Sequence, residues 1–301
     1  MNSCEDVTAV VVTFNPNLEI LNRGLRTLSS QVGAVVVVDN HSESMIDELH
    51  LPPDAILIRL SSNHGVAYGH NIGIERARRQ GARYVLLMDQ DSVPRDGMVR
   101  ELLEVHEDIS RKGRLVAGVG CRYSDNTQGS LSGFVRFGHF GFKRAADDSN
   151  SRYVEADFLI SSGTLISLHT LDAVGPMEVG LFIDHVDTEW FLRAQANGYR
   201  AYGANKAVME HTLGERRNRF WFLRWRVVPH HAPIRYYYMV RNSILLLRRD
   251  YATKKWRRGV VLKLVLTGLY FFFTLTDWDK LRMMNRGLRD GLRGVYGQYT
   301  G

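Results

Sequence analysis

The sequence predicts an α/β protein in which helices cover both faces of a mostly parallel sheet. Short apolar runs alternate with longer segments of helical pattern through the first hundred residues. Strands that are apolar throughout are typical of a sheet buried on both faces, because parallel strands are joined by crossover helices. The chain of 301 residues is long enough for one such domain with an appended region.

The elements of the first half follow one another as strand, helix, strand, strand, helix, strand. We expect strands at residues 7–13, 34–39, 55–60 and 84–88, and helices at residues 18–30 and 66–80. Residues 128–151, rich in Gly, Ser and Asp with interspersed Phe, are predicted either as a long loop over a site or as a pair of edge strands. A later helix begins near Asp184 and ends near Asn197, where Gly198 favours termination.

Composition excludes a disordered chain and a disulfide framework. Hydrophobic residues make up 45% of the sequence, which is ordinary for a globular protein. Two cysteines, Cys4 and Cys121, fit a reducing compartment. The first residues show neither the basic nor the apolar region of a signal peptide, so we expect a cytoplasmic protein.

Charge is distributed unevenly along the chain. Residues 216–301 hold 19 Lys+Arg and 4 Asp+Glu, a net charge of +15, whereas residues 1–215 have a net charge of −8. Such asymmetry predicts a negatively charged partner for the C-terminal region. We therefore divide the chain into an α/β domain at residues 1–215 and a basic, aromatic, helical region at residues 216–301.

The C-terminal region combines a basic cluster with a long apolar run. Residues 234–249 have a helical pattern, residues 254–258 are basic, and residues 260–276 are apolar apart from Lys263. The apolar run is at the short limit for crossing a bilayer. We favour a helix lying in an anionic membrane surface over a core helix packed on the α/β domain. Nucleic acid is disfavoured as a partner, because no zinc, RNA-recognition or helix-turn-helix signature accompanies the Arg and aromatic residues.

Two carboxylates follow the strand predicted at residues 84–88. Asp89 and Asp91 cannot lie in the strand interior, because an unpaired buried charge is very costly. They must lie where the strand emerges, which is the edge at which α/β sheets bind ligands. Residues i and i+2 share a face of a strand, so both carboxylates can converge on one ion. Oxygen ligands without a nearby cysteine favour Mg²⁺ or Mn²⁺ shared with the phosphates of a substrate.

Polar residues leave the other strands at the same edge. Thr13 and Asn15 follow the first strand and Asp39 ends the second, where a carboxylate suits hydrogen bonds from a nucleoside. The alternative is that these residues only form the turns after the strands, because Asn, Asp and Pro are common in turns that bind no ligand. Gly65, at the start of the next helix, would let a phosphate or sugar approach the backbone. The four-residue spacing of Gly65, Gly69 and Gly73 is alternatively a helix face packed tightly on the sheet.

A second acidic cluster opens the helix near residue 184. Asp184, Asp187 and Glu189 would complement the helix dipole, and that alone accounts for acids in a first turn. The alternative is that one of them is a general base placed opposite a leaving group.

Taken together, these motifs resemble the inverting nucleotide-sugar glycosyltransferases of family 2, which have the GT-A fold, and within that family the bacterial rhamnosyltransferases. The resemblance covers residues 7 to about 215 and, more weakly, the rest of the chain. The motifs that carry it lie at residues 13–16, 38–40, 63–71, 87–92, 161–166, 182–190, 211–215, 237–242 and 287–297. One departure concerns Asp184-His185, because many family members carry Glu directly before the base.

The resemblance implies a role for each motif. The nucleotide-sugar site would comprise Thr13, Asn15, Asp39, Asn63, Gly65, Asn71, Asp89, Gln90 and Asp91. The metal, Mg²⁺ or Mn²⁺, would be held by Asp89, Asp91 and His211. Asp187 matches the catalytic base, with Asp184 as its rival and Glu189 as an acceptor-orienting acid. Ser162, Gly163, Thr164 and Trp190 would line the pocket where donor and acceptor meet.

The activity implied is metal-dependent, inverting transfer of L-rhamnose from dTDP-L-rhamnose to a hydroxyl of a surface polysaccharide or glycolipid. The acceptor would be a glycan or a lipid-linked molecule. The protein would bind peripherally to the inner face of the cytoplasmic membrane. The alternatives are a hexosyl- or galactofuranosyltransferase using a UDP-sugar, and a sugar-nucleotide- or lipid-binding module without catalysis. The sequence leaves open the linkage, the choice between Mg²⁺ and Mn²⁺, and whether the C-terminal region forms a homo-oligomer.

Overall fold

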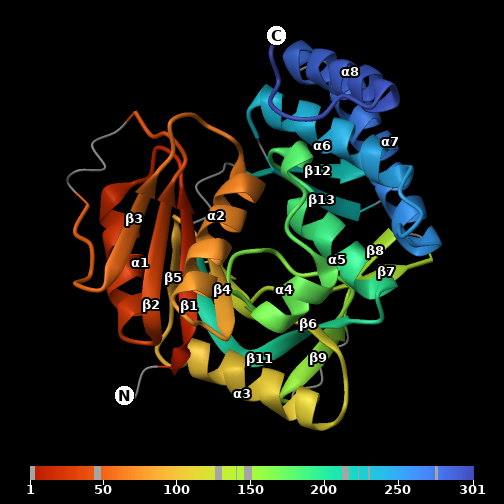
Figure 1. Cartoon of the computed structure of the whole chain (residues 1–301). Helices are drawn as coiled ribbons and strands as arrows, with labels where there is room; N and C mark the ends of the chain where they lie inside the picture. The colour runs from red at the N-terminus through yellow and green to blue at the C-terminus, as the bar shows by residue number, and fades with distance from the viewer. Residues whose placement is uncertain are drawn as a thin grey trace.

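In the computed structural model, the described residues form one nine-stranded mixed sheet with helices on both faces (Figure 1). The structure describes residues 4–43, 49–125, 131–139, 141–145, 151–211, 217–222, 224–229, 231–274 and 277–301. The strands of the sheet are β1 (Cys4–Thr13), β2 (Val32–Asp39), β3 (Ala55–Arg59), β4 (Tyr84–Asp89), β5 (Ser92–Pro94), β6 (Val116–Asp125), β9 (Tyr153–Ala156), β10 (Thr164–Ser167) and β11 (Arg200–His211).

The helices include every helix that the sequence predicts. They are α1 (Leu18–Ser29), α2 (Val66–Arg79), α3 (Met98–Arg111), α4 (Leu168–Val174), the 3-10 turn η2 (Val179–Leu181), α5 (Val186–Ala196), α6 (Pro233–Leu247), α7 (Lys254–Thr274) and α8 (Trp278–Arg293). Helix α5 is followed by Asn197 and Gly198, and Gly198 has a positive φ of 87°, which only glycine adopts readily.

The sheet has the strand order β3-β2-β1-β4-β10-β6-β11-β5, with β9 also beside β11. Strands β3, β2, β1 and β4 are mutually parallel, as predicted for the first half of the chain. Beyond β4 the sheet is mixed, because β10 runs antiparallel to both β4 and β6. In the parallel half, Thr13 pairs with Asp39 and Val12 with Asp89, so three strands end level with one another.

Alternate residues of the central strands feed two hydrophobic cores. On β1, Ala9 and Val11 join the core covered by α1 and α3, and Val10 joins the core covered by α2, α4 and α5. Helix α2 lies very close to β1, because a Cβ at Gly69 would be 2.7 Å from Cγ1 of Val12 and one at Gly73 would be 2.2 Å from Cγ1 of Val10. These two glycines therefore serve the packing of the helix on the sheet.

Residues 128–151 include a hairpin of the strands β7 (Val135–Gly138) and β8 (Gly141–Arg144). The described part therefore forms strands rather than one long loop, but these strands make a separate two-stranded sheet and are not edge strands of the main sheet. Residues 128–130, 140 and 146–150 of this range lie outside the described residues. A second hairpin, β12 (Arg217–Phe222) and β13 (Arg224–Pro229), precedes α6.

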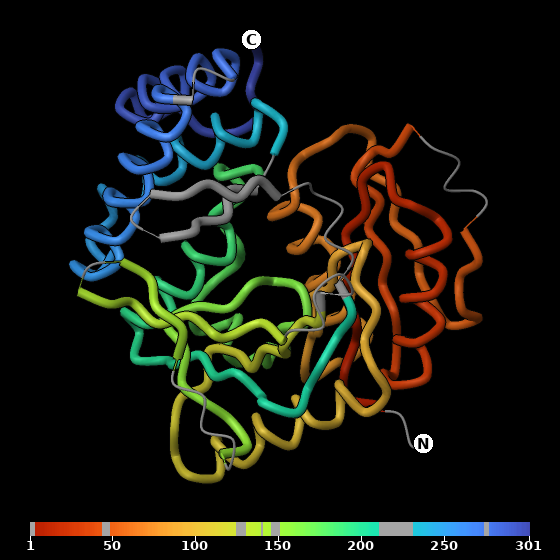
Figure 2. Tube along the Cα trace, turned by 180° about the vertical axis from the view of Figure 1, so that it is seen from behind, coloured from red at the N-terminus to blue at the C-terminus, as the bar shows by residue number. Residues whose placement is uncertain are grey.

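Figures 1 and 2 place helices α6, α7 and α8 together on one side of the molecule, with strands β1–β3 on the other. Leu245 and Leu246 of α6 and Trp256 and Val260 of α7 belong to the same hydrophobic core as α2 and α5. Helix α7 also has exposed apolar residues, which are Val261, Leu262, Val265, Leu269, Phe272 and Phe273. Among the described helices, none combines the length and the apolar character that crossing a membrane requires.

Candidate functional site

A cavity of about 600 Å³ lies at the carboxyl ends of β1 and β4. Its walls come from these two strand ends, from the start of α2, from the segment before α5, and from α6. The lining residues are Val12, Thr13, Phe14, Asn40, Asn63, Gly65, Val66, His70, Asp89, Gln90, Asp91, Tyr123, Ile160, Ser161, Phe182, Ile183, Asp184, His185, Val186, Asp187 and Arg235. The cavity thus brings together residues from Val12 to Arg235, which are more than 200 positions apart in the sequence.

The ends of β1 and β2 are joined by buried hydrogen bonds. The Thr13 hydroxyl donates to Oδ1 of Asp39 at 3.0 Å, and the backbone N–H of Ser42 donates to Oδ2 at 3.1 Å. Asp39 is 1% exposed and lies just behind the cavity, whereas Thr13 lines it. Asn15, two residues after Thr13, accepts from the N–H of Glu43 at 2.8 Å, which ties the loop after β1 to the loop after β2.

Two amide side chains hold the loops at the rim of the cavity. Gln90 accepts from the N–H of Phe14 at 2.6 Å and donates to its carbonyl at 3.1 Å. Asn63 accepts from Nδ2 of Asn40 at 2.9 Å and from the N–H of Gly65 at 3.0 Å. These residues line the cavity while using their amides on the backbone and on each other, so they shape the loops around it.

Asp89 and Asp91 lie in the cavity wall where β4 ends, as predicted. Burial raises the pKa of Asp89 to about 7, and the nearby carboxylates of Asp91 and Asp187 add to the rise, while Arg235 opposes it. Such a cluster of half-buried negative charge fits a hard divalent cation, which would offset the repulsion. Among the described side chains, no group of three or more His, Cys, Asp or Glu residues gathers as a metal site.

His211 ends β11, where its backbone pairs with Ser92, the residue after Asp91. Its side chain is outside the described residues, so its role as a third metal ligand stays a prediction.

The segment before α5 has an unusual backbone. Phe182, Asp184 and His185 have positive φ angles of 66°, 60° and 63°, a region that residues other than glycine rarely adopt. Asn242 of α6 holds this segment by donating from Nδ2 to the carbonyls of Leu181, Ile183 and Asp184 at 3.0, 2.7 and 2.8 Å. The strained backbone is therefore fixed by the C-terminal region.

Arg241 adds to this support from a completely buried position. Its guanidinium donates to the carbonyls of Leu181 at 2.9 Å and Gly297 at 2.5 Å, and it lies over the rings of Tyr237 and Tyr238. The motif at residues 237–242 thus positions the segment that carries the second acidic cluster.

The three acids of that cluster have three different environments. Asp187 lines the cavity and accepts from the N–H of Thr188 at 2.7 Å, and burial raises its pKa to about 6. Asp184 also lines the cavity, but Arg235 binds both of its oxygens at 2.8 Å. Arg235 was not among the residues predicted from the sequence. It lies in the first turn of α6, and no sequence pattern indicates that this turn packs beside Asp184.

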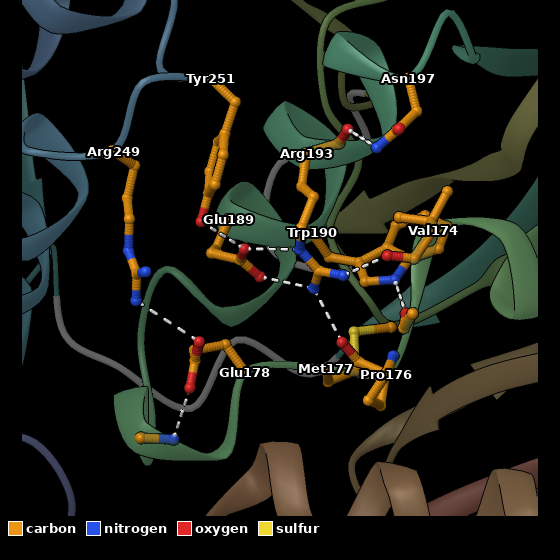
Figure 3. Close-up of polar contacts among 12 residues, drawn as sticks. Val174, Pro176, Met177, Glu178, Glu189, Trp190, Arg193, Asn197, Arg249 and Tyr251 are labelled. Carbon is orange, nitrogen blue, oxygen red and sulfur yellow. Dashed lines mark hydrogen bonds and ion pairs between the residues drawn. The ribbon is translucent and has the colours of Figure 1, made fainter.

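Glu189 is not among the described residues that line the cavity, and its carboxylate lies in the contact between α5 and the C-terminal region (Figure 3). It is 1% exposed and accepts from Nε and Nη2 of Arg193 at 2.8 and 2.9 Å and from the Tyr251 hydroxyl at 2.7 Å. Trp190 is completely buried beside it and donates from Nε1 to the Gly175 carbonyl at 2.9 Å. Neither residue occurs among the described residues that line the cavity, so the structure does not bring them to the other predicted site residues.

The remaining predicted residues lie around the cavity rather than in its lining. Asn71 accepts from the N–H of Met177 and donates to its carbonyl, both at 2.9 Å. Ser162 accepts from the N–H of Asp89 at 3.0 Å and so supports the end of β4. Gly163 has a φ of 75° and packs on Cys121, and the Thr164 hydroxyl donates to the Ile160 carbonyl at 2.6 Å. Ser161, which was not predicted, is the residue of this segment that lines the cavity.

A second cavity of about 240 Å³ adjoins the first, since Asp184 and His185 line both. Its other walls are mostly apolar or aromatic residues of the β7–β8 hairpin, of the segment after β9, of α6 and of α7, together with Thr188 of α5 and Lys263 of α7. The lining residues are Val135, Phe142, Phe158, Asp184, His185, Thr188, Met239, Trp256 and Lys263.

Two comparisons with known sequences bear on this site. Residues 8–167 match the family model described as Glycosyl transferase family 2. The dTDP-rhamnosyl transferase RfbF of Shigella flexneri is 32% identical, over 99% of this chain and 98% of that protein. The low-salt glycan biosynthesis hexosyltransferase Agl10 of Haloferax volcanii is 25% identical, over 64% of this chain and 62% of that protein.

Solved structures are similar in fold. Residues 1–349 of S. aureus TarS in complex with UDP-GlcNAc superpose with a TM-score of 0.60 at 15% identity, covering 96% of this chain and 81% of that one. GalNAc-T7 with UDP, GalNAc and Mn²⁺ superposes with a TM-score of 0.54 at 12% identity, covering 68% of this chain and 43% of that one.

Proposed function

The chain belongs to glycosyltransferase family 2 and has the GT-A fold, and from this premise we propose that it is a metal-dependent, inverting rhamnosyltransferase. The observation that carries the proposal is that Asp187 lies in one cavity with Asp89, Asp91 and Thr13. A transferase of this kind must hold a nucleotide, neutralise a leaving diphosphate and deprotonate a hydroxyl. The cavity offers one group of residues for each task.

The nucleoside of the donor would lie at the ends of β1 and β2. The hydrogen-bonded pair of Thr13 and Asp39 is buried and level with the end of β4, so a nucleoside bound there would direct its diphosphate toward Asp89 and Asp91. These two carboxylates would hold Mg²⁺ or Mn²⁺, with His211 as the predicted third ligand. The bound cation supplies positive charge for the leaving diphosphate, as cations do for transferring phosphoryl groups.

Asp187 would be the general base. Its pKa of about 6 leaves it ionised at neutral pH yet close to the range in which proton transfer is efficient. Asp187 takes the proton of the acceptor hydroxyl while the acceptor oxygen bonds to the anomeric carbon and the diphosphate leaves with the electron pair of the broken bond. Attack on the face opposite the diphosphate inverts the anomeric configuration. Asp184 is less suited to this role, because Arg235 occupies both of its oxygens.

The donor that we propose is dTDP-L-rhamnose. Its support is the similarity to a dTDP-rhamnosyl transferase over nearly the whole of both chains. A UDP-sugar is the second candidate, because the chain is also similar to a hexosyltransferase. Both donors would use the same carboxylates and the same base, so the choice of sugar does not change the mechanism.

The acceptor would approach through the second cavity. This cavity meets the first at Asp184 and His185, close to Asp187 in the sequence, and its apolar walls include Phe142, Phe158 and Trp256. Lys263 is its basic residue, and the described residues offer its ammonium no hydrogen bond or ion pair shorter than 4 Å. An amphipathic acceptor with an anionic group, such as a glycan linked to a lipid through phosphate, would use both features.

Helix α7 supplies the surface that would meet an anionic membrane. Its exposed side chains include apolar residues such as Phe272 and Phe273 and the basic residues at its start, and basic residues next to a membrane attract anionic lipid. The protein would thus be peripheral on the cytoplasmic face of the membrane. We expect Phe272→Asp with Phe273→Asp to lose binding to phosphatidylglycerol vesicles, whereas Leu115→Asp, at an equally exposed leucine in another part of the chain, keeps it. Equal sedimentation of both variants would contradict the membrane assignment.

Calorimetric titration with dTDP, UDP and GDP, each with and without Mn²⁺, tests the proposal as a whole. We expect dTDP to bind more tightly than UDP or GDP, and only in the presence of the cation. Tighter binding of UDP would change the donor and keep the mechanism. If nucleotide binding does not depend on the cation, the metal has no place in the proposed mechanism. If no nucleotide binds, the proposed function is refuted.

A further inference from the structure

His70 is a buried residue of α2 that lines the main cavity without a hydrogen-bond partner. It is 1% exposed, and among the described residues neither of its ring nitrogens has a donor or acceptor within reach. Buried polar groups in proteins are nearly always hydrogen-bonded, and leaving one without a partner costs free energy. The position therefore calls for a reason other than stability.

The backbone around His70 is fixed on both sides. Gly69 packs against Val12 of β1, and Asn71 makes its two hydrogen bonds to the backbone of Met177. One turn earlier, the N–H of Val66 donates to the Phe182 carbonyl at 2.8 Å. Helix α2 is thus tied to β1 and to the segment that leads to Asp187, and the ring of His70 is held at the cavity wall.

The imidazole is neutral under ordinary conditions. Burial lowers the pKa of His70 to about 4, so at neutral pH one ring nitrogen carries a proton and the other is an acceptor. A neutral imidazole offers one donor and one acceptor. That combination suits a hydroxyl group, which also donates and accepts, better than it suits a diphosphate, which only accepts.

We propose that His70 hydrogen-bonds a hydroxyl of the donor's sugar and so distinguishes the sugar nucleotide from the free nucleotide. This inference rests on the proposed function, because it takes the cavity to be the donor site. His70 would lie between the strand ends that receive the nucleoside and the segment that carries Asp187, which is where the transferred sugar must be. The substrate would then complete the hydrogen bonds that the described protein residues do not offer His70.

The test compares the affinities of wild-type protein and variants for dTDP and for dTDP-L-rhamnose, by calorimetry with Mn²⁺. His70→Phe keeps a planar ring but loses both hydrogen-bonding atoms. We expect it to bind dTDP within twofold of wild type and dTDP-L-rhamnose about tenfold more weakly, as for one net hydrogen bond. His70→Gln keeps a donor and an acceptor, and should recover most of the lost affinity.

His106 of α3 provides the matched control. It is also buried, its Nε2 also has no partner among the described residues, and it packs on Tyr84 rather than lining the cavity. His106→Phe should change neither affinity. Thermal unfolding of His70→Phe should occur at the wild-type temperature or above it, because the substitution removes an unsatisfied polar group.

Each other outcome overturns the inference in a recognisable way. If dTDP binds wild type but His70→Phe binds dTDP-L-rhamnose as wild type does, the contact does not exist. If His70→Phe loses dTDP and dTDP-L-rhamnose equally, or unfolds at a lower temperature, His70 supports the structure or the nucleotide rather than the sugar. Should UDP bind in place of dTDP, the same comparison is made with UDP and UDP-glucose. If neither nucleotide binds wild type, the proposed function fails and this inference fails with it.

Discussion

Asp187 and Glu189 are two residues apart on α5, yet their carboxylates have opposite surroundings. Asp187 faces a cavity that is also lined by the carboxylates of Asp89, Asp91 and Asp184, and its pKa is raised to about 6. Glu189 faces the interior, where Arg193 and Tyr251 satisfy both of its oxygens. Residues two apart on a helix point in directions about 200° apart, so one acidic motif supplies one charge to the cavity and another to the scaffold.

The difference shows that one of the two acids contributes to the stability of the fold and the other to the chemistry of the cavity. Glu189 connects α5 to the loop before it, through Arg193 and the carbonyls of Val174 and Pro176, and to the C-terminal region through Tyr251 (Figure 3). Asp187 accepts hydrogen bonds from the backbone and hydroxyl of Thr188 and from the backbone of Ser161, and no cation pairs with it among the described residues. We therefore expect substitution of Asp187 to affect turnover and substitution of Glu189 to affect folding.

Asp187→Asn should have the largest effect on activity. Loss of a general base typically costs 10²–10⁴-fold in rate, so we expect kcat for rhamnosyl transfer to fall by about that factor. Binding of dTDP with Mn²⁺ should change little. The measurement is a transfer assay on folded protein together with calorimetry. If transfer is retained, Asp187 is not the base, and a binding module without catalysis becomes the better description of any nucleotide binding.

Glu189→Gln should have the converse effect. Removing one partner of a buried charge pair leaves Arg193 without its counter-charge, which typically costs 3–5 kcal/mol. Because Arg193 also donates to the Val174 and Pro176 carbonyls, we expect a loss of about 2–4 kcal/mol in the free energy of unfolding. Denaturant unfolding measures it, and kcat per folded molecule should stay within threefold, roughly the limit of an indirect effect.

Asp172 provides the control for this loss. It pairs with Arg78 at 2.6 Å, but its side chain is 58% exposed. Asp172→Asn should therefore change the free energy of unfolding by less than about 1 kcal/mol. Equal losses for the two substitutions would mean that Glu189 gains nothing from its burial, and a loss of kcat in Glu189→Gln without a loss of stability would return Glu189 to the acceptor-orienting role.

The sequence predicts this division only in part. The end of β4 at Asp89 follows from the physics of buried charge, and the helices follow from their apolar periodicity. The directions of Asp187 and Glu189 were not predicted, because they depend on where α6 and α7 pack, and those contacts join residues more than 45 positions apart. His70 and Arg235 were missed for the same reason, since their importance comes from what the fold places beside them.

The pH dependence of transfer separates the two carboxylates further. With a pKa of about 6, Asp187 loses its proton as the pH rises through 6, so kcat should increase about tenfold per pH unit below 6 and level off above it. A pH profile of kcat between 4.5 and 8.5 measures this limb. Glu189→Gln should leave the limb in place, because Glu189 is not in contact with the cavity.

The same pKa makes a prediction about stability. Because the pKa of Asp187 is higher in the folded state than its ordinary value of 3.8, the ionised carboxylate destabilises the fold above pH 6, and this cost disappears as the pH falls below 4. Asp187→Asn should therefore stabilise the protein at pH 8 by up to about 3 kcal/mol, and by less than about 1 kcal/mol at pH 4. Denaturant unfolding at the two pH values checks the sign. A variant less stable than wild type at pH 8 would show that Asp187 is part of the scaffold, like Glu189.

Asp184→Asn should have the smallest effect, and it sharpens the comparison most. Asp184 is intermediate between the other two acids: it lines the cavity as Asp187 does, and it is paired with an arginine as Glu189 is. If Asp187 is the base, then Asp184→Asn only releases Arg235, and we expect kcat to fall less than tenfold, which is less than the loss of a base. The limb near pH 6 should remain in this variant, because the group that causes it is unchanged. A larger fall in kcat for Asp184→Asn than for Asp187→Asn, with loss of the limb, would exchange the two roles. It would then be the carboxylate held by Arg235, and not the one left unpaired beside Asp89, that accepts the proton.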